Sequence, residues 1–204
     1  FGTVLAIIIF YKKDFLSLLS GIHKNFNFQF DHKDARFLRL LVLATVPVIC
    51  AGYILHSTGL IYEIRSIKTI GYGMIIFGLI LYISDKYGTK NRQKNHWSYR
   101  DALIMGIWQA FALIPGTSRS GNTISGGLFL GFSRQSSVNL SLLMSIPTIL
   151  ASSFLLSIDL FRTDFKNSEP LILIFSSFLS FLAAFLALYF FVKFIKTNNF
   201  TPFV

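Results

Sequence analysis

Long apolar runs with few or no charges are the feature that most constrains how this chain folds. They lie at residues 1–11, 37–55, 69–84, 102–114 with 122–132, 137–158 and 171–192. A helix needs about 20 apolar residues to cross a hydrocarbon core about 30 Å thick. Hydrophobic residues make up 53% of the chain, only slightly more than in soluble domains, so their arrangement decides the class. We predict an all-α, polytopic integral membrane protein, a helical bundle that forms one membrane domain over residues 1–204.

The basic residues predict orientation in the membrane rather than a nucleic-acid partner. The formal net charge is +10, but Lys and Arg lie in short loops between the apolar runs. Six of them lie in residues 12–39 and five in 86–100, against two each in 56–68 and 159–169. Cytoplasmic loops of membrane proteins are enriched in Lys and Arg. We therefore place 12–36 and 85–100 in the cytoplasm and the other two connections outside.

The run from 101 to 132 is predicted to enter and leave the membrane on one side. Residues 101–114 span about 21 Å as a helix and residues 122–132 about 16 Å, at 1.5 Å per residue. Neither limb crosses a core of about 30 Å. Two half-helices that meet at a polar tip fit both the lengths and the loop charges. The longer limb places this tip past the midplane, nearer the outer face.

Two other segments carry predictions of their own. In residues 12–36, Phe15, Leu18, Leu19 and Ile22 share one helical face, which suits either a helix in the membrane interface or one packed on protein. The single cysteine, Cys50, lies inside an apolar run, where we expect a small buried packing residue.

The two ends indicate a piece of a longer protein. The opening "FGTVLAIIIFY" is typical of the tail of a span that begins earlier, and "NNFTPFV" stops where a further helix would begin. We therefore expect a membrane domain that is truncated at both ends.

The tip segment "ALIPGTSRSGNTISGG", residues 112–127, carries Arg119 in otherwise apolar surroundings. An arginine within a membrane costs about 2.5–3.5 kcal/mol on insertion scales and is tolerated where it meets a partner. All nine acidic residues lie in loops or at span ends, and the nearest, Asp85 and Asp101, lie at the cytoplasmic rim. An anionic ligand is therefore the natural counter-charge of Arg119.

The residues around Arg119 favour phosphate as that anion. Pro115 and Gly116 end the first limb, and Ser120 or Asn122 is expected to N-cap the second, whose free N–H groups then face the ligand. A guanidinium grips phosphate with two hydrogen bonds. The candidate catalytic residues are Arg119 and Ser118, and the candidate substrate-binding residues are Gly116, Thr117, Ser120, Gly121, Asn122 and Thr123.

Plainer interpretations stay open. The tip could be an ordinary turn whose arginine reaches to lipid headgroups. It is not a nucleotide-binding P-loop, because no Gly-Lys-Ser/Thr follows. The four histidines have no metal-ligand spacing, so no metal ligand is predicted. Gln109, on the first limb, is expected to pack but could reach a ligand.

The stretch "WQAFALIPGTSRSGNTISGGLFLGFSR", followed by "SLLMSIP", resembles the second signature of the bacterial undecaprenyl-diphosphate phosphatases, the bacitracin-resistance proteins. The resemblance extends over essentially the whole chain. It implies an inverted-repeat fold with two re-entrant hairpins in the bacterial inner membrane. It also implies an enzyme that releases the terminal phosphate of undecaprenyl diphosphate, a lipid carrier of cell-wall synthesis. Arg119 would bind the diphosphate with Ser118 beside it, and Thr123 and the loop glycines would shape the pocket.

The resemblance also implies a divalent cation, Mg or Ca, and shows what is missing. The first signature of the family, a glutamate-rich stretch that ends in Ser-Ser-Thr-Gly-His, is not in these 204 residues. We therefore expect this chain alone to bind a polyprenyl diphosphate lipid without hydrolysing it. The non-enzymatic alternative is a lipid or small-anion transporter or flippase that uses the same re-entrant site. The oligomeric state stays open, with a homodimer as one candidate.

Overall fold

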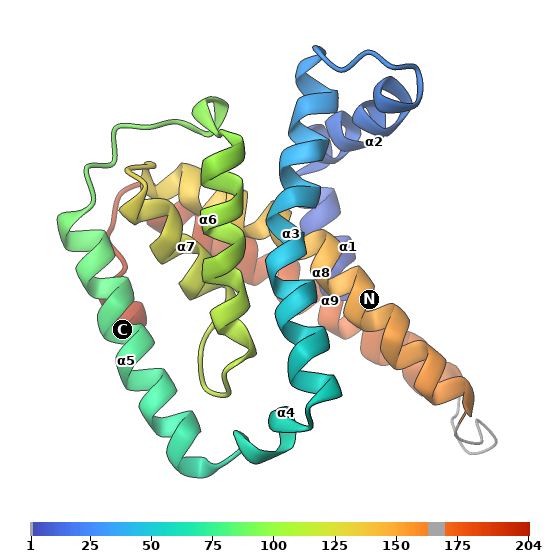
Figure 1. The fold of residues 1–204 in the computed structure, drawn as a ribbon, viewed down its shortest axis with the longest axis vertical. Coiled ribbons are helices and arrows are strands. Elements are labelled where there is room, and N and C mark those ends of the chain that lie inside the picture. Colours follow the sequence, from blue (N-terminus) through green and yellow to red (C-terminus); the bar gives the residue numbers. More distant parts are fainter. Residues whose placement is uncertain (1, 163–169) are drawn as a thin grey trace.

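A computed structural model describes residues 2–162 and 170–204, in which helices are joined by turns and short loops (Figure 1). The helices are α1 (Gly2–Phe10), α2 (Lys12–Phe26), α3 (Lys33–Ser57), α4 (Leu60–Glu63), α5 (Ile67–Tyr87), α6 (Tyr99–Ala110), α7 (Arg119–Phe129), α8 (Arg134–Arg162) and α9 (Pro170–Ile195). Within the described residues no strand is formed, so the all-α prediction is confirmed.

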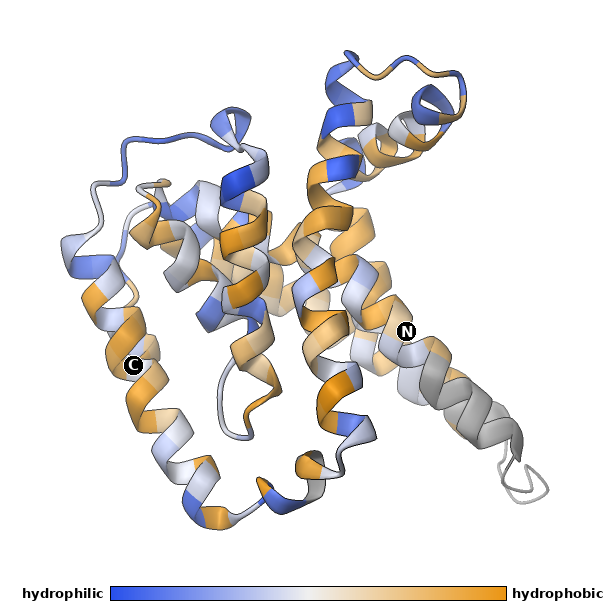
Figure 2. Cartoon of the chain, viewed as in Figure 1, coloured by the Kyte–Doolittle hydropathy of each residue, from blue (hydrophilic) through white to orange (hydrophobic). Residues whose placement is uncertain are grey.

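Four of these helices are long and apolar enough to cross a membrane: α3, α5, α8 and α9. Apolar residues run along the outer sides of α5 and α3, where a soluble protein would carry polar ones (Figure 2). Ile76 and Leu79, for example, are 51% and 52% exposed on α5. Such a surface is stable against lipid tails and not against water. The chain is therefore a multi-pass membrane protein.

Cys50 differs from its prediction. It lies on the exposed side of α3 and does not pack in the core. An apolar run facing lipid and one facing protein have the same composition, so hydropathy could not distinguish them.

The hairpin between residues 99 and 129 is present. Helices α6 and α7 lie side by side, antiparallel, and are joined at one end by the tip (Figure 1). Their other ends are held together by the loop before α6, where Arg92 N–H donates to Gly131 O at 2.9 Å and Ser133 N–H donates to Arg92 O at 2.8 Å. The chain therefore enters and leaves the hairpin at the same end of the bundle.

The tip docks on the first turns of α5. A Cβ added to Gly116 would lie 2.2 Å from Ile70 O, and one added to Gly73 would lie 2.7 Å from Pro115 O. Because α5 begins at Ile67, the tip lies near the end of the bundle opposite to the loop that holds Arg92. This agrees with a tip beyond the midplane.

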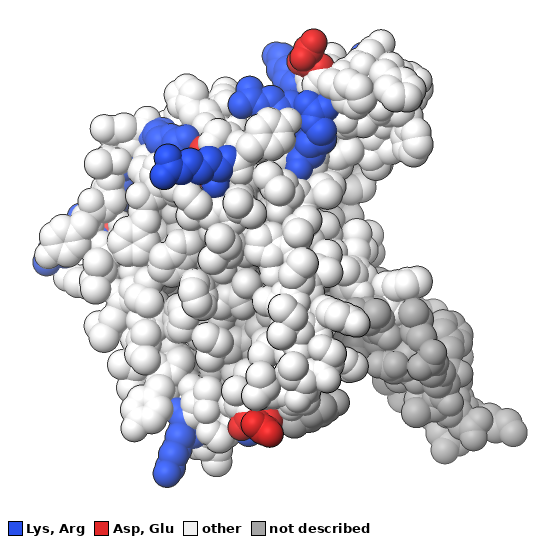
Figure 3. Space-filling model, in the orientation of Figure 1, with Lys and Arg blue, Asp and Glu red and all other residues white. Residues whose placement is uncertain are grey.

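Most of the Lys and Arg side chains on the visible face gather at one end, over the start of α3 and the loop before α6 (Figure 3). This is the end that the positive-inside rule assigns to the cytoplasm. Of the predicted outer loop 159–169, residues 163–169 lie outside the described residues.

Helix α2 both packs on protein and exposes apolar residues, the two arrangements that the sequence left open for this segment. Leu18 and Gly21 are buried, and a Cβ on Gly21 would lie 2.5 Å from Asp34 O of α3. Leu19 and Ile22 are 47% and 43% exposed. One edge of the helix therefore packs on protein while the rest of its apolar face is open to an interface.

Candidate functional site

The first limb ends through a 3-10 turn and a left-handed glycine. After α6 ends at Ala110, residues Phe111–Leu113 form the 3-10 turn and Ile114 is extended, with ψ 126°. Gly116 has φ +90°, a conformation that only glycine adopts without strain. The Thr117 hydroxyl donates to Phe111 O at 3.0 Å and Ile114 O at 2.8 Å. Thr117 therefore closes the turn with its side chain.

The second limb begins earlier than its pattern predicted. Ser118 is the N-cap, since its backbone is extended and its Oγ accepts from Gly121 N–H at 3.1 Å. The expected caps, Ser120 and Asn122, are wrong, because both lie inside the first turn of α7. The limb starts at Arg119, so the first backbone N–H groups of α7, which a helix leaves unpaired, lie at the arginine itself. Arg119 and an anion-binding helix terminus thus share one place.

Arg119 is half-buried and forms no ion pair within the described residues. Its Nη1 donates to Thr148 Oγ1 of α8 at 2.9 Å. The sequence analysis missed Thr148, whose only signal was its position next to Pro147 in a helix rich in hydroxyls. Among the described residues, therefore, no carboxylate offsets the positive charge of Arg119.

Three carboxylates, those of Asp14, Asp85 and Asp101, lie at the opposite end of the bundle, and each has a basic partner. Asp85 accepts from Arg134 Nε at 2.6 Å, and Asp101 accepts from Arg92 Nη2 at 2.6 Å. Asp14 pairs with Lys94. None of these acids is free to approach the tip.

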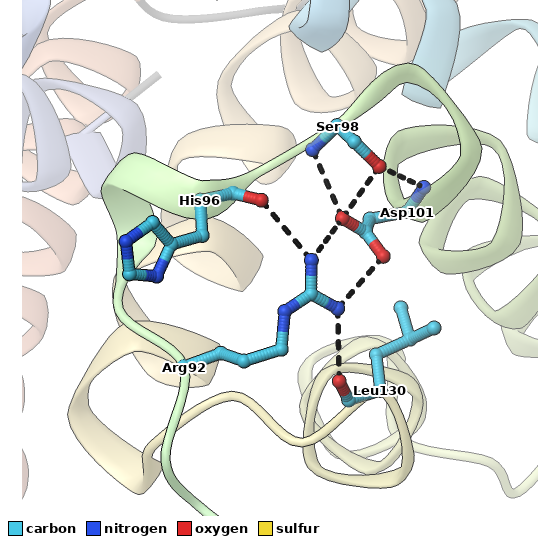
Figure 4. Close-up of polar contacts among 5 residues, drawn as sticks. All are labelled: Arg92, His96, Ser98, Asp101 and Leu130. Carbon is cyan, nitrogen blue, oxygen red and sulfur yellow. Dashed lines mark hydrogen bonds and ion pairs between the residues drawn. The ribbon is translucent and has the colours of Figure 1, made fainter.

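Arg92 joins the two feet of the hairpin (Figure 4). It binds both carboxylate oxygens of Asp101, at the start of α6, and donates to Leu130 O, at the end of α7, at 2.9 Å. Burial alone would raise the pKa of Asp101, but hydrogen bonds from Arg92 and Ser98 outweigh it and hold that pKa below its usual value. Sequence analysis did not find this clamp, since Arg92 was only one of several loop cations.

Small and hydroxyl residues bring α7 close to α8. The Thr123 and Ser141 hydroxyls hydrogen-bond to each other, and a Cβ on Gly127 would lie 2.8 Å from Ser137 Oγ. Close approach through such residues is typical of helix contacts in membranes. Thr123, predicted to bind substrate, is therefore buried in the α7–α8 contact.

Two amides are buried near the tip. Asn122 and Gln109 are each 1% exposed, and no partner is found among the described residues for Asn122 Nδ2 or for either polar atom of the Gln109 amide. A buried polar atom without a partner is unfavourable by about 1–3 kcal/mol. The interior around the tip is therefore more polar than packing requires.

A cavity of about 1400 Å³ opens beside the first turn of α7. Ser118, Ser120, Gly121 and Asn122, with Gly116, line it at the tip, and its walls are mostly apolar side chains of α1, α5, α8 and α9, with Lys193 of α9 among them. Among the predicted site residues, Arg119, Thr117 and Thr123 are not part of its lining. The structure thus separates these residues into a group at the cavity and a group turned toward α8 or the turn.

The side chains at the tip and elsewhere in the described residues do not form a binding site for a divalent cation. No group of three His, Cys, Asp or Glu side chains that could hold a metal occurs in residues 2–162 and 170–204. The tip offers N–H groups, hydroxyls and a guanidinium, which bind anions, whereas Mg²⁺ and Ca²⁺ prefer carboxylate oxygens. The described residues therefore fit an anion and do not fit a directly bound cation.

Comparison with known proteins gives one consistent result. The family model described as bacitracin resistance protein BacA matches residues 1–204. A protein of Jannaschia sp. (strain CCS1) named undecaprenyl-diphosphatase is 41% identical over 204 residues, which cover 100% of this chain and 76% of the relative. Another protein with this name, from Ruegeria pomeroyi, is 41% identical over 203 residues with the same two shares. The "undecaprenyl-diphosphatase 1" of Pseudoalteromonas translucida is 35% identical over 203 residues, again with these shares.

Proposed function

The chain belongs to the bacitracin resistance protein family, and on this premise we propose that it is an undecaprenyl-diphosphatase. It removes the terminal phosphate of undecaprenyl diphosphate and leaves undecaprenyl phosphate. The relatives carry the name of this hydrolase, and none of the described features favours the transporter. The chain is therefore a membrane-embedded phosphatase acting on a lipid-linked substrate.

The observation that carries the proposal is the place of Arg119. It begins α7, a half-helix whose free N–H groups favour an anion, and it has no carboxylate partner among the described residues. Phosphoryl transfer needs charge neutralisation on the phosphate oxygens. The guanidinium, which lies outside the cavity lining on the α8 side of the tip, and the α7 terminus would supply this neutralisation, while Ser118 and Ser120 line the cavity beside the same terminus.

The cavity walls suit the rest of the substrate. Apolar residues of α5 and α9, among them Met74, Phe77 and Phe191, line the space that leads away from the α7 terminus. Burial of a prenyl chain against these walls would stabilise the complex by about 25 cal/mol for each Å² of apolar surface removed from water. The headgroup would lie at the tip and the tail along the walls.

Ser118 is also a candidate nucleophile for attack on the phosphate. Its Oγ accepts a hydrogen bond as the N-cap, and no basic side chain among the described residues is placed to activate it as a nucleophile. We therefore assign to Ser118 the positioning of α7 and contact with the substrate. The general base of the reaction is not assigned to a described residue.

Three finer points are part of the proposal. The protein lies in the cytoplasmic membrane of a bacterium. A divalent cation, Mg or Ca, assists the reaction, although the described residues supply no direct ligand set for it. The third point is a homodimer, which the mass of the purified protein in detergent would distinguish from a monomer.

The experiment is phosphate release from farnesyl diphosphate with Mg²⁺, with Ca²⁺ and with a chelator, by the protein at its full encoded length and by residues 1–204 alone, of which we expect the second to bind the substrate without hydrolysing it. Arg119→Lys keeps the charge and loses the two-pronged grip, so we expect kcat/KM to fall about tenfold to a hundredfold. Arg100→Lys, at an exposed position on the first turn of α6 and at the opposite end of the hairpin from the tip, is the matched control. Wild-type turnover in Arg119→Lys would show that the guanidinium is not the phosphate clamp. Phosphate release equal in chelator would remove the cation from the proposal.

A further inference from the structure

The bond to Thr148 is the only hydrogen bond that the guanidinium of Arg119 makes within the part of the chain that the structure describes. It joins the start of α7 to the middle of α8 over 29 positions in the sequence. The Thr148 oxygen accepts from Nη1, while its own hydrogen can go to Ser145 O at 3.0 Å or Met144 O at 3.2 Å. The hydroxyl is thereby oriented by its own helix before it meets the arginine.

This single contact leaves the phosphate-binding edge of the guanidinium open. Arginine has five N–H donors in a planar fork, and Thr148 receives one of them. No hydrogen bond to Nε or Nη2 is found among the described residues, and these two atoms form the edge that can make two parallel bonds to a phosphate. A hydroxyl suits this place better than a carboxylate, because it fixes the plane of the fork without neutralising its charge.

The contact is the last of a series along α8. Ser137 lies against Gly127, Ser141 bonds with Thr123, and Thr148 bonds with Arg119. Each step moves toward the tip on both helices. The α7–α8 contact therefore continues into the site, and its last member acts on the side chain that binds phosphate.

We propose that Thr148 is a positioning residue that holds the Arg119 guanidinium in one orientation for the diphosphate, a role that rests on the function proposed above. Free arginine side chains have many rotamers, and an ordered fork loses less entropy when the ligand binds. Thr148 does not touch the substrate in this role. Its effect on phosphate passes through Arg119 alone.

The test compares Thr148→Val, which keeps the shape and removes the oxygen, with Thr148→Ser, which keeps the oxygen. We expect Thr148→Val to lower kcat/KM on farnesyl diphosphate about tenfold to a hundredfold, with a weaker affinity for inorganic pyrophosphate measured by calorimetry. Thr148→Ser should restore both to near wild type. Thr45→Val is the matched control, because among the described residues the buried Thr45 hydroxyl has Leu41 O, of its own helix, as its single hydrogen-bond partner.

A double-mutant cycle shows whether the effect passes through the arginine. In an Arg119→Lys background, Thr148→Val should cause no further loss, because the oriented fork is already gone. Additive losses would overturn the proposal, as would equal losses in Thr148→Val and Thr148→Ser. Should Thr148→Val not fold, Thr148→Ala removes the same oxygen and carries the same expectations.

The two proposals fail in different ways. Wild-type phosphate release with an unimpaired Thr148→Val overturns the positioning role and leaves the function standing. If the protein at its full encoded length binds pyrophosphate but hydrolyses no diphosphate, the proposed activity is contradicted, while the affinity of the variants still decides the role of Thr148. A wild-type chain that neither hydrolyses nor binds overturns both.

Discussion

The docking of the tip on α5 predicts that one methyl group at Gly73 disturbs the site. A Cβ at this position would lie 2.7 Å from Pro115 O and 3.4 Å from Thr117 Cγ2. The first distance is shorter than real Cβ atoms show, and the atom it meets is backbone, so the tip or α5 must move. Overpacking of this kind costs about 1–3 kcal/mol, against a gain of about 0.5–1 kcal/mol for alanine over glycine in a helix.

The same helix provides the control. Gly71, two residues away, has nothing within 4 Å of an added Cβ. Gly71→Ala should therefore keep or raise the midpoint of thermal unfolding in detergent. Gly73→Ala should lower it, and it should lower kcat/KM for farnesyl diphosphate by about tenfold or more, because a 1 Å misplacement of a catalytic group costs about a hundredfold.

Equal turnover and equal unfolding midpoints in the two variants would refute the reasoning. They would mean that the tip does not rest on α5 in the working protein. A Gly73→Ala that unfolds earlier but keeps full turnover would separate the packing of the tip from the function of Arg119.

Three further predictions concern the feet of the hairpin. Arg92→Ala should lower the free energy of unfolding by about 2–3 kcal/mol. This is less than the loss of about 3–5 kcal/mol expected for a fully buried ion pair, because the Arg92 side chain is 35% exposed. The control is Arg100→Ala, whose side chain forms no ion pair among the described residues and whose free energy of unfolding should change by no more than about 0.5 kcal/mol. The pKa of Asp101 is lowered in the folded state, so its ionised form stabilises the fold above about pH 4, and this stability is lost as the pH falls through the folded pKa. Asp101→Asn should therefore unfold with a lower free energy at pH 7 and lose less of that free energy in acid, as measured by unfolding at both pH values. A loss in acid equal to that of the wild type would contradict this prediction. Single cysteines at positions 94 and 134, in a Cys50→Ser background, should react with an impermeant thiol reagent from the same side of the membrane, whereas labelling from opposite sides would exclude the hairpin.

The helices and the hairpin could be predicted because their causes are local. A run of apolar residues must form a helix in lipid whatever its neighbours are, and limbs of 14 and 11 residues are too short to cross. The isolation of Arg119 was also readable, because no acidic residue lies near it in the sequence and the spans separate it from the rims. Length, hydropathy and charge position are sufficient for these conclusions.

The details of the site depended on tertiary structure. Ser118, Ser120 and Asn122 are all good caps by composition, and only the backbone geometry after Gly116 selected Ser118. The bond from Arg119 to Thr148 joins two helices whose rotation about their axes no local pattern determines.

Two further features were decided by packing alone. Gly73 and Gly71 have the same sequence signal, yet only Gly73 meets the tip. Cys50 faces outward although its neighbours in sequence are as apolar as those of buried residues. In a membrane both the core and the surroundings are apolar, so hydropathy determines which segments are helices, and only the contacts between the helices decide which of their faces form the site.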